Sequence, residues 1–244
     1  MTLLEIRNVS KTFRSLKALD GVDIDVQAGT FHGLIGPNGS GKSTLLKAIA
    51  GAHFADSGTV VFDGHDITRA TPYERARAGL SLKFQITAVL PELSVYDNVL
   101  LAMQSTESLP RLLLSLSRRA LDADVTSLLE RFRLIDRADD LAGELSHGQQ
   151  QWLEIAMALA LRPKLLLLDE PTGGMSPEER RVTGELLAPI KAHCSLIIVE
   201  HDLHFIRDIC DRLTVLDQGK VLDQGDVEAI QRSSKVQQVF TTRV

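Results

Sequence analysis

The sequence predicts an α/β protein with a parallel-sheet core, an antiparallel β part and an inserted helical part. Three observations carry this prediction: a glycine-rich turn joins a strand to a helix near residue 36, strands and helices alternate after residue 163, and helical patterns fill residues 94–161. Such alternation is typical of a parallel sheet, because a parallel crossover needs a long connection, usually a helix. We therefore expect one domain, residues 1–244, with a helical subdomain inserted at about 86–162 and a helical tail at about 226–244.

Strand patterns flank the glycine-rich turn in the first part of the chain. Apolar and polar residues alternate in two segments, which a polar stretch containing Lys11, Arg14 and Lys17 divides. A third strand runs into the turn, and the helix after the turn is expected to stop at Gly51. The expected elements are strands at 3–9, 22–26, 31–35 and 59–62 and a helix at 43–50.

Strands and helices alternate in the last part of the chain. Four consecutive leucines at 165–168 fit a strand that is covered on both faces. Pro189 should end or kink its helix near Ala188. The expected elements are strands at 165–168 and 196–199, helices at 177–191 and 203–211, a hairpin of 213–217 and 220–223 around Gln218-Gly219, and a final helix from Val227.

Composition excludes several classes of protein. Of the 244 residues, 44% are hydrophobic and 24% charged, as in ordinary soluble globular proteins. A net charge of -5 argues against nucleic acid as a partner. No apolar run reaches the 18 or so residues of a membrane helix. Glu5 and Arg7 stand where a signal peptide would be apolar, so we expect a cytoplasmic protein. Cys194 and Cys210 form no metal-binding pattern and are expected to be buried in a reducing compartment.

The glycine-rich turn has the full pattern of a phosphate-binding loop. Its glycines let backbone N–H groups surround a phosphate, the following helix points its positive end at it, and Lys42 reaches the outer phosphates. Ser43 would bind Mg²⁺. The alternative, a glycine turn with a chance lysine, would match in roughly one chain of this length in a hundred. The expected nucleotide-binding residues are Gly36, Pro37, Asn38, Gly39, Ser40, Gly41, Lys42, Ser43 and Thr44.

Two acids follow the leucine strand directly. Asp169 and Glu170 would lie at the carboxyl end of a parallel strand, where such sheets bind ligands. Alone, this pattern is weak, because a buried strand that ends at a helix cap looks the same. In a chain that also has a phosphate-binding loop, Asp169 is expected to help hold Mg²⁺ through its waters, and Glu170 is expected to orient the attacking water.

A third segment, Leu-Ser-His-Gly-Gln at 145–149, stands just before a helix. Ser146 is a good N-cap, and the N–H groups of this helix end would form a second anion site. With the phosphate loop and the two acids in this order, the chain resembles the ATP-binding subunit of an ATP-binding-cassette (ABC) transporter from about Val9 to Gly225. The resemblance implies a P-loop NTPase (RecA-like) core, ATP and Mg²⁺ as cofactors, and ATP hydrolysis.

The resemblance also implies roles for single residues. Phe13 would stack on adenine, Gln85 would sense Mg²⁺ and the membrane partner, and His201 would contact the γ-phosphate. Lys42, Glu170 and His201 would form the catalytic set. Each has an alternative: Phe13 as a core residue, Gln85 as a solvated polar residue, and His201 as part of a metal cluster with Glu200, Asp202 and His204.

The resemblance further implies a head-to-tail dimer with two ATP molecules between the chains. In such a dimer Ser146, His147, Gly148 and Gln149 would contact the ATP of the partner chain, identical or paralogous. Expected partners are transmembrane permease subunits and an extracytoplasmic solute-binding protein, with this chain peripheral on the cytoplasmic face of the inner membrane.

Two residues depart from the usual family pattern. His147 replaces a glycine in the segment at 145–149, although the Ser146 hydroxyl and the Gly148 backbone are kept. Ser176 stands where the family usually has Asp. The sequence Ser-Pro-Glu-Glu at 176–179 is typical of a capping box, so Ser176 is expected to cap a helix.

Several segments look most like the branch that serves importers of branched-chain amino acids, urea and similar solutes: residues 82–102, 200–225 and 236–240. A lipopolysaccharide-export ATPase is a close alternative, and a soluble ABC ATPase of cluster assembly or repair is another. Val89, Leu93, Val95 and Tyr96 would form a groove for a permease helix, which weighs against the soluble alternative; each of them could instead be a core residue.

Overall fold

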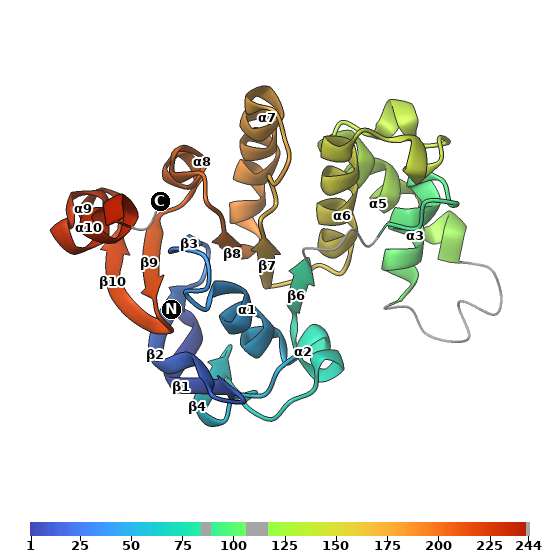
Figure 1. Cartoon of the computed structure of the whole chain (residues 1–244). Helices are drawn as coiled ribbons and strands as arrows, with labels where there is room; N and C mark the ends of the chain where they lie inside the picture. The colour runs from blue at the N-terminus through green and yellow to red at the C-terminus, as the bar shows by residue number, and fades with distance from the viewer. Residues whose placement is uncertain (84–88, 106–116, 243–244) are drawn as a thin grey trace. The chain divides into compact units, whose positions relative to one another are not determined.

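The computed structural model describes residues 1–83, 89–105 and 117–242 (Figure 1). The chain divides into two compact units. The first comprises residues 1–82, 164–171 and 190–244, and the second comprises residues 83–163 and 172–189. Among the described helices, none is long and apolar enough to cross a membrane.

The first unit contains two β-sheets. A six-stranded sheet has the order β10-β9-β3-β8-β7-β6, and β3 runs parallel to β8 and β9, as β7 does to β8. Its strands are β3 (Phe31–Ile35), β6 (Leu80–Lys83), β7 (Leu165–Asp169), β8 (Ser195–Val199), β9 (Arg212–Asp217) and β10 (Lys220–Asp226). The second sheet is antiparallel, of order β2-β1-β4-β5. Its strands are β1 (Thr2–Phe13), β2 (Leu16–Gln27), β4 (Ser57–Phe62) and β5 (His65–Asp66).

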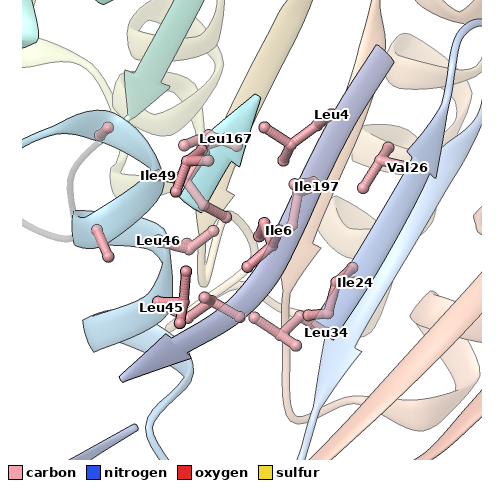
Figure 2. Close-up of a cluster of buried hydrophobic side chains, with 14 of the residues drawn as sticks. Leu4, Ile6, Ile24, Val26, Leu34, Leu45, Leu46, Ile49, Leu167 and Ile197 are labelled. Carbon is pink, nitrogen blue, oxygen red and sulfur yellow. The ribbon is translucent and has the colours of Figure 1, made fainter. Parts of the chain in front are cut away.

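Helix α1 (Lys42–Ala50) belongs to one apolar cluster with both sheets (Figure 2). Its leucine and isoleucine side chains are buried, and they meet residues such as Ile6 of β1 and Leu167 of β7. Gly51 ends the helix in the left-handed region, at φ 80°. This packing fixes the helix that follows the glycine-rich turn.

The other helices of the first unit are short: α2 (Pro72–Ala78), α8 (Leu203–Ile209), α9 (Val227–Arg232) and α10 (Ser234–Thr242). Helix α2 begins with a capping box, in which Thr71 and Glu74 satisfy each other's backbone N–H groups. Arg75 of α2 is 1% exposed and donates to the carbonyls of Ala48 and Ile49, at 2.7 and 2.6 Å. It therefore satisfies carbonyls in the last turn of α1.

The second unit is helical. It consists of α3 (Val95–Gln104), α5 (Ser117–Arg131), α6 (His147–Ala160), α7 (Pro177–Leu187) and the short 3-10 helices Ile135–Arg137 and Ala142–Glu144. Helices α3, α5 and α6 pack on one another. Trp152 of α6 donates from Nε1 to Thr183 Oγ1 of α7 at 2.8 Å, which ties these two helices together.

Three expectations about the elements were wrong. The polar stretch around Lys11 does not divide two short strands. It forms the ends of the long hairpin β1–β2, in which Lys11 faces Leu19 and Phe13 faces Leu16. Polar residues are tolerated there because these strand ends are largely exposed to solvent.

The last expected helix is two helices. Ser233 separates α9 from α10, and its hydroxyl donates to Asp223 Oδ2 on β10 at 2.6 Å. The helix expected at 177–191 ends at Leu187, and a 3-10 helix, Ala188–Ala192, continues the chain. Pro189 thus ends the α-helix beside Ala188, as expected.

The alternation and helix patterns of the sequence also missed three elements: α2, β5 and β6.

The residues of the proposed permease groove differ in their exposure to solvent. Val95 is fully buried and is therefore a core residue, whereas Leu93 is 36% exposed. Both cysteines are buried, as expected, and burial raises the pKa of the Cys194 thiol to about 12.

Candidate functional site

The glycine-rich turn between β3 and α1 needs glycine at particular positions. Gly36 has φ 150°, and a Cβ on it would lie 2.1 Å from the carbonyl oxygen of Leu216. Gly41 has φ 107°, and its Cβ would lie 2.5 Å from the carbonyl oxygen of Ala18. Any side chain at either position would displace neighbouring backbone. At Gly39, by contrast, a Cβ would meet nothing within 4 Å, so the loop is open on that side.

Lys42 lies at the start of α1 and reaches back across the loop. Its Nζ donates to the carbonyls of Gly36 and Pro37, at 2.8 and 3.0 Å. Burial lowers the pKa of Lys42, and the negative charges of Glu170 and Asp169 oppose that shift. A buried cation at a glycine-rich turn that leads into a helix is an arrangement that binds phosphate.

Asp169 ends β7 within hydrogen-bond reach of the loop. The Ser43 hydroxyl donates to Asp169 Oδ1 at 3.4 Å. Asp169 is 5% exposed, and burial raises the pKa of its carboxyl, although the bond from Ser43 acts in the opposite direction. Both oxygens are of the kind that Mg²⁺ takes as ligands, either directly or through its waters. Their chemistry, a hydroxyl and a carboxylate, therefore fits Mg²⁺.

Glu170 and His201 meet at the carboxyl ends of the neighbouring strands β7 and β8. The Glu170 backbone N–H donates to the carbonyl of Val199 at 2.9 Å, which extends the ladder between these strands by one residue. Glu170 has φ 51°, a left-handed value that is uncommon for a non-glycine residue. His201 Nε2 donates to Glu170 Oε1 at 3.0 Å. The structure thus brings together two residues of the expected catalytic set.

A pocket of about 590 Å³ lies along the glycine-rich turn. This volume lies within the usual range for small-molecule sites. Phe13 lines the pocket and is 39% exposed, so the alternative that it is a core residue is wrong. Its ring meets the edge of His53 at a centroid distance of 5.4 Å. The expected residues that line the pocket are Phe13, Asn38, Gly39, Ser40, Gly41, Lys42, Ser43, Thr44, Glu170 and His201.

Sequence reasoning missed other residues of this pocket: Leu16, Lys17, Ala18 and Gln218. Three of them follow Phe13 closely in the chain, and the hairpin turn that places them there could have indicated them. No local signal points to Gln218, because its approach to the loop depends on a sheet contact far along the chain. Gln85 lies outside the described residues.

Ser146, His147, Gly148 and Gln149 lie in the second unit. Ser146 and Gln149 form a capping box: the Ser146 hydroxyl accepts from the Gln149 N–H at 3.3 Å, and Gln149 Oε1 accepts from the Ser146 N–H at 3.1 Å. His147 Nε2 donates to the carbonyl of Gly173 at 3.0 Å. A Cβ on Gly148 would lie 2.5 Å from Glu179 Oε1, so a larger residue here would displace the Glu179 side chain.

A metal cluster around His201 was the alternative to a phosphate contact. Within residues 1–83, 89–105 and 117–242, no group of three or more His, Cys, Asp or Glu side chains is arranged to hold a metal ion. Asp202 instead caps helix α8, where its carboxylate accepts from the backbone N–H groups of His204 and Phe205. The cluster interpretation was therefore wrong.

Known proteins are similar to this chain over more than nine tenths of its residues. A probable branched-chain amino acid transport ATP-binding protein LivG of Archaeoglobus fulgidus is 36% identical over 98% of this chain and 95% of its own. The methionine import ATP-binding protein MetN 2 of Pseudomonas entomophila is also 36% identical, over 93% of this chain and 68% of its own.

Solved structures agree with these relatives. An ATP-binding cassette of an ABC transporter in its ADP conformation superimposes with a TM-score of 0.87 at 33% identity, over 99% of both chains. A dimeric cassette in a post-hydrolysis state, bound to ADP and Pi, has a TM-score of 0.79 at 26% identity, over 92% of this chain and 99% of its own. Residues 19–173 match the ABC transporter family. The chain therefore belongs to the ABC transporter family and is one of its ATP-binding, ATP-hydrolysing cassettes with the P-loop NTPase fold.

Proposed function

We propose that this chain is the ATPase of an ABC importer for branched-chain amino acids, urea or a similar small solute. The observation that carries the ATPase part is the meeting of Lys42, Ser43, Asp169, Glu170 and His201 around one loop and its pocket. The solute class rests on the likeness to a branched-chain amino acid transport protein over nearly the whole chain. A methionine import protein is also 36% identical, so the binding experiment includes methionine among the candidate solutes.

Each site residue has a proposed part in hydrolysis. Phe13 stacks on adenine, and the loop from Gly36 to Thr44 binds the phosphates through backbone N–H groups and Lys42. Ser43 and Asp169, together with Gln85, hold Mg²⁺, which when bound neutralises charge on the phosphates.

Glu170 is proposed to accept a hydrogen bond from the attacking water and orient it toward the γ-phosphate. His201 donates to the Glu170 carboxylate at 3.0 Å. With ATP bound, its Nε2–H would donate to the γ-phosphate instead. The short distance between the two side chains supports this pair of roles, since both then reach the same reacting group.

The proposed working unit is a dimer of ATPase chains. Ser146, His147, Gly148 and Gln149 would complete the ATP site of the partner chain, because the Ser146 hydroxyl and the N–H groups of the α6 N-terminus suit an anion. A related cassette that is dimeric with ADP and Pi supports this arrangement. Further proposed partners are permease subunits and a solute-binding protein. This chain would be peripheral on the cytoplasmic face of the membrane, and its residues 1–244 would form one ATP-binding domain.

Co-purification tests the importer assignment. The tagged chain is extracted from native membranes in mild detergent, and the proteins that accompany it are identified. Two permeases with a second ABC ATPase are expected, and binding of candidate solutes to the associated solute-binding protein then identifies the solute. Export-type partners, or recovery of the chain alone from the soluble fraction, would contradict the importer assignment while leaving ATP hydrolysis intact.

A further inference from the structure

The turn between β9 and β10 lies against the phosphate loop by backbone contacts. The Gly219 N–H donates to the carbonyl of Ser40 at 2.9 Å, inside the loop itself. The Gly219 carbonyl accepts from the Asp20 N–H of β2 at 2.8 Å. At the other end of the loop, the space beside Gly36 is filled by the carbonyl of Leu216 on β9. The hairpin therefore supports the loop at two points.

The turn has little freedom to move. Gln218 and Gly219 have φ values of 49° and 79°, the left-handed pair that a tight two-residue hairpin requires. A Cβ on Gly219 would lie 2.8 Å from the carbonyl oxygen of Ala18, so the turn is in close contact with β2. Lys220 also pairs with Asp20 of β2, at 3.2 Å. The Gln218 side chain is thus presented from a fixed backbone.

Gln218 lines the same pocket as Phe13 and Lys42. Phe13 pairs with Leu16 in the hairpin β1–β2, and Ala18 follows two residues later on β2; these residues line the pocket as well. Ala18 and Gly219 both lie against Gly41: a Cβ on Gly41 would be 2.5 Å from the Ala18 carbonyl and 3.6 Å from Gly219 Cα. The turn therefore contacts both the strand that follows Phe13 and the phosphate-binding loop.

From this placement we infer that the Gln218 amide binds a ribose hydroxyl of the nucleotide. Between the base at Phe13 and the phosphates at Lys42, a nucleoside triphosphate has its ribose. A primary amide can donate to one hydroxyl and accept from another. The inference rests on the proposed binding of ATP in this pocket, and it adds a ribose-binding residue to that site.

Three variants and three nucleotides test the inference. Gln218→Ala removes the amide and keeps a Cβ on the same left-handed backbone. Gln218→Gly removes the amide and relaxes that backbone. Gln224→Ala is the matched control, since Gln224 is an exposed glutamine on the same hairpin that does not line the pocket. Dissociation constants are measured by calorimetry for ATP, 2′-deoxy-ATP and 3′-deoxy-ATP.

Both Gln218 variants should bind ATP about three- to tenfold more weakly than the wild type, the effect of one lost hydrogen bond. For at least one of the two deoxynucleotides, the wild type and the Gln218 variants should have equal dissociation constants. That nucleotide lacks the ribose hydroxyl that the Gln218 amide binds, so removing the amide costs nothing further. Gln224→Ala should bind all three nucleotides as the wild type does and should turn over ATP at the wild-type rate.

Two results would overturn the inference: unchanged ATP affinity in both Gln218 variants, or equal losses for ATP and both deoxynucleotides. Either result would leave ATP binding by the wild type intact. A wild-type chain that binds no ATP would instead contradict the proposed function, so the two failures are distinguishable.

Discussion

Glu170 combines a strained backbone with a position suited to catalysis. A non-glycine residue at φ 51° carries a cost of roughly 1–3 kcal/mol, which persists where the surroundings fix the conformation. Here the bond from its N–H to the carbonyl of Val199 holds the backbone, while the side chain meets His201. Such local strain is concentrated at functional sites, which is consistent with the proposed role of Glu170 in hydrolysis.

Ser176 offers a test of a single capping hydroxyl. Its Oγ accepts from the Glu179 N–H at 3.3 Å and donates to Glu179 Oε2 at 2.8 Å, at the start of α7. Ser176→Ala should lower the free energy of unfolding by about 1 kcal/mol, because an N–H at the helix start loses its partner. Ser176→Thr, which keeps the hydroxyl, should lose less in the same urea titration. Equal losses in both variants would show that Ser176 is not acting as a cap.

At the scale of elements, a buried ion pair joins Lys83 to Glu154 of α6 within the second unit. Lys83 Nζ lies 3.1 Å from Glu154 Oε2, and both side chains are 3% exposed. Glu154→Gln should destabilise the protein by about 3–5 kcal/mol, because the Lys83 charge stays buried without its counter-charge. The double variant Lys83→Met, Glu154→Leu should recover most of that loss.

The exposed pair Arg162–Asp124, at 2.8 Å in the same unit, is the matched control. Asp124→Ala should cost less than about 1 kcal/mol, since water screens this pair. A loss for Glu154→Gln as small as that for Asp124→Ala, in parallel urea unfolding, would contradict the account of the buried pair.

Local signals predicted several elements, and long-range contacts account for what was missed. The N-cap at Ser146, the capping box at Ser176 and the effect of Pro189 depend on neighbours within a few residues, so the sequence predicts them. Arg75 carries no such signal, because it contacts α1 from a helix more than twenty residues along the chain. In the same way, the approach of Gln218 to the phosphate loop appears only once β9 lies beside β3.

At the scale of the whole molecule, we expect His32 to make the free energy of unfolding depend on pH. It is buried in β3, hydrogen-bonded at 2.8 Å between Nε2 and Thr214 Oγ1 of β9, and burial lowers its pKa to about 4, with a smaller effect of Arg212. In the unfolded chain the imidazole takes up a proton near its ordinary pKa of about 6.5. Stability from this residue is therefore fully present above pH 6.5 and is lost as the pH falls toward 4.

The loss from His32 should reach about 3 kcal/mol at pH 4. His32→Gln, which does not titrate, should remove that part of the pH dependence when unfolding free energies at pH 7 and pH 4 are compared. An unchanged difference between the two pH values would contradict the assignment to His32.

The fold class was predictable because the phosphate loop, the leucine strand and the change to helical patterns are each local in the sequence. The bounds of the strands between these segments were harder to predict. The hairpin β1–β2 continues through polar residues such as Lys11, where the alternation of apolar and polar residues stops. In the site, Lys42, Asp169 and Glu170 follow from motifs, whereas the strained backbone at Glu170 depends on β8 and has no local signature.

The central claim is that this chain hydrolyses ATP with Glu170 beside the phosphate loop. The most direct test compares Mg²⁺-ATP binding and steady-state hydrolysis by the wild type and Glu170→Gln. The amide keeps the size of the side chain and removes the negative charge that orients the water, so the variant should bind ATP as the wild type does while hydrolysis falls at least about a hundredfold. Turnover at the wild-type rate in Glu170→Gln would contradict the claim.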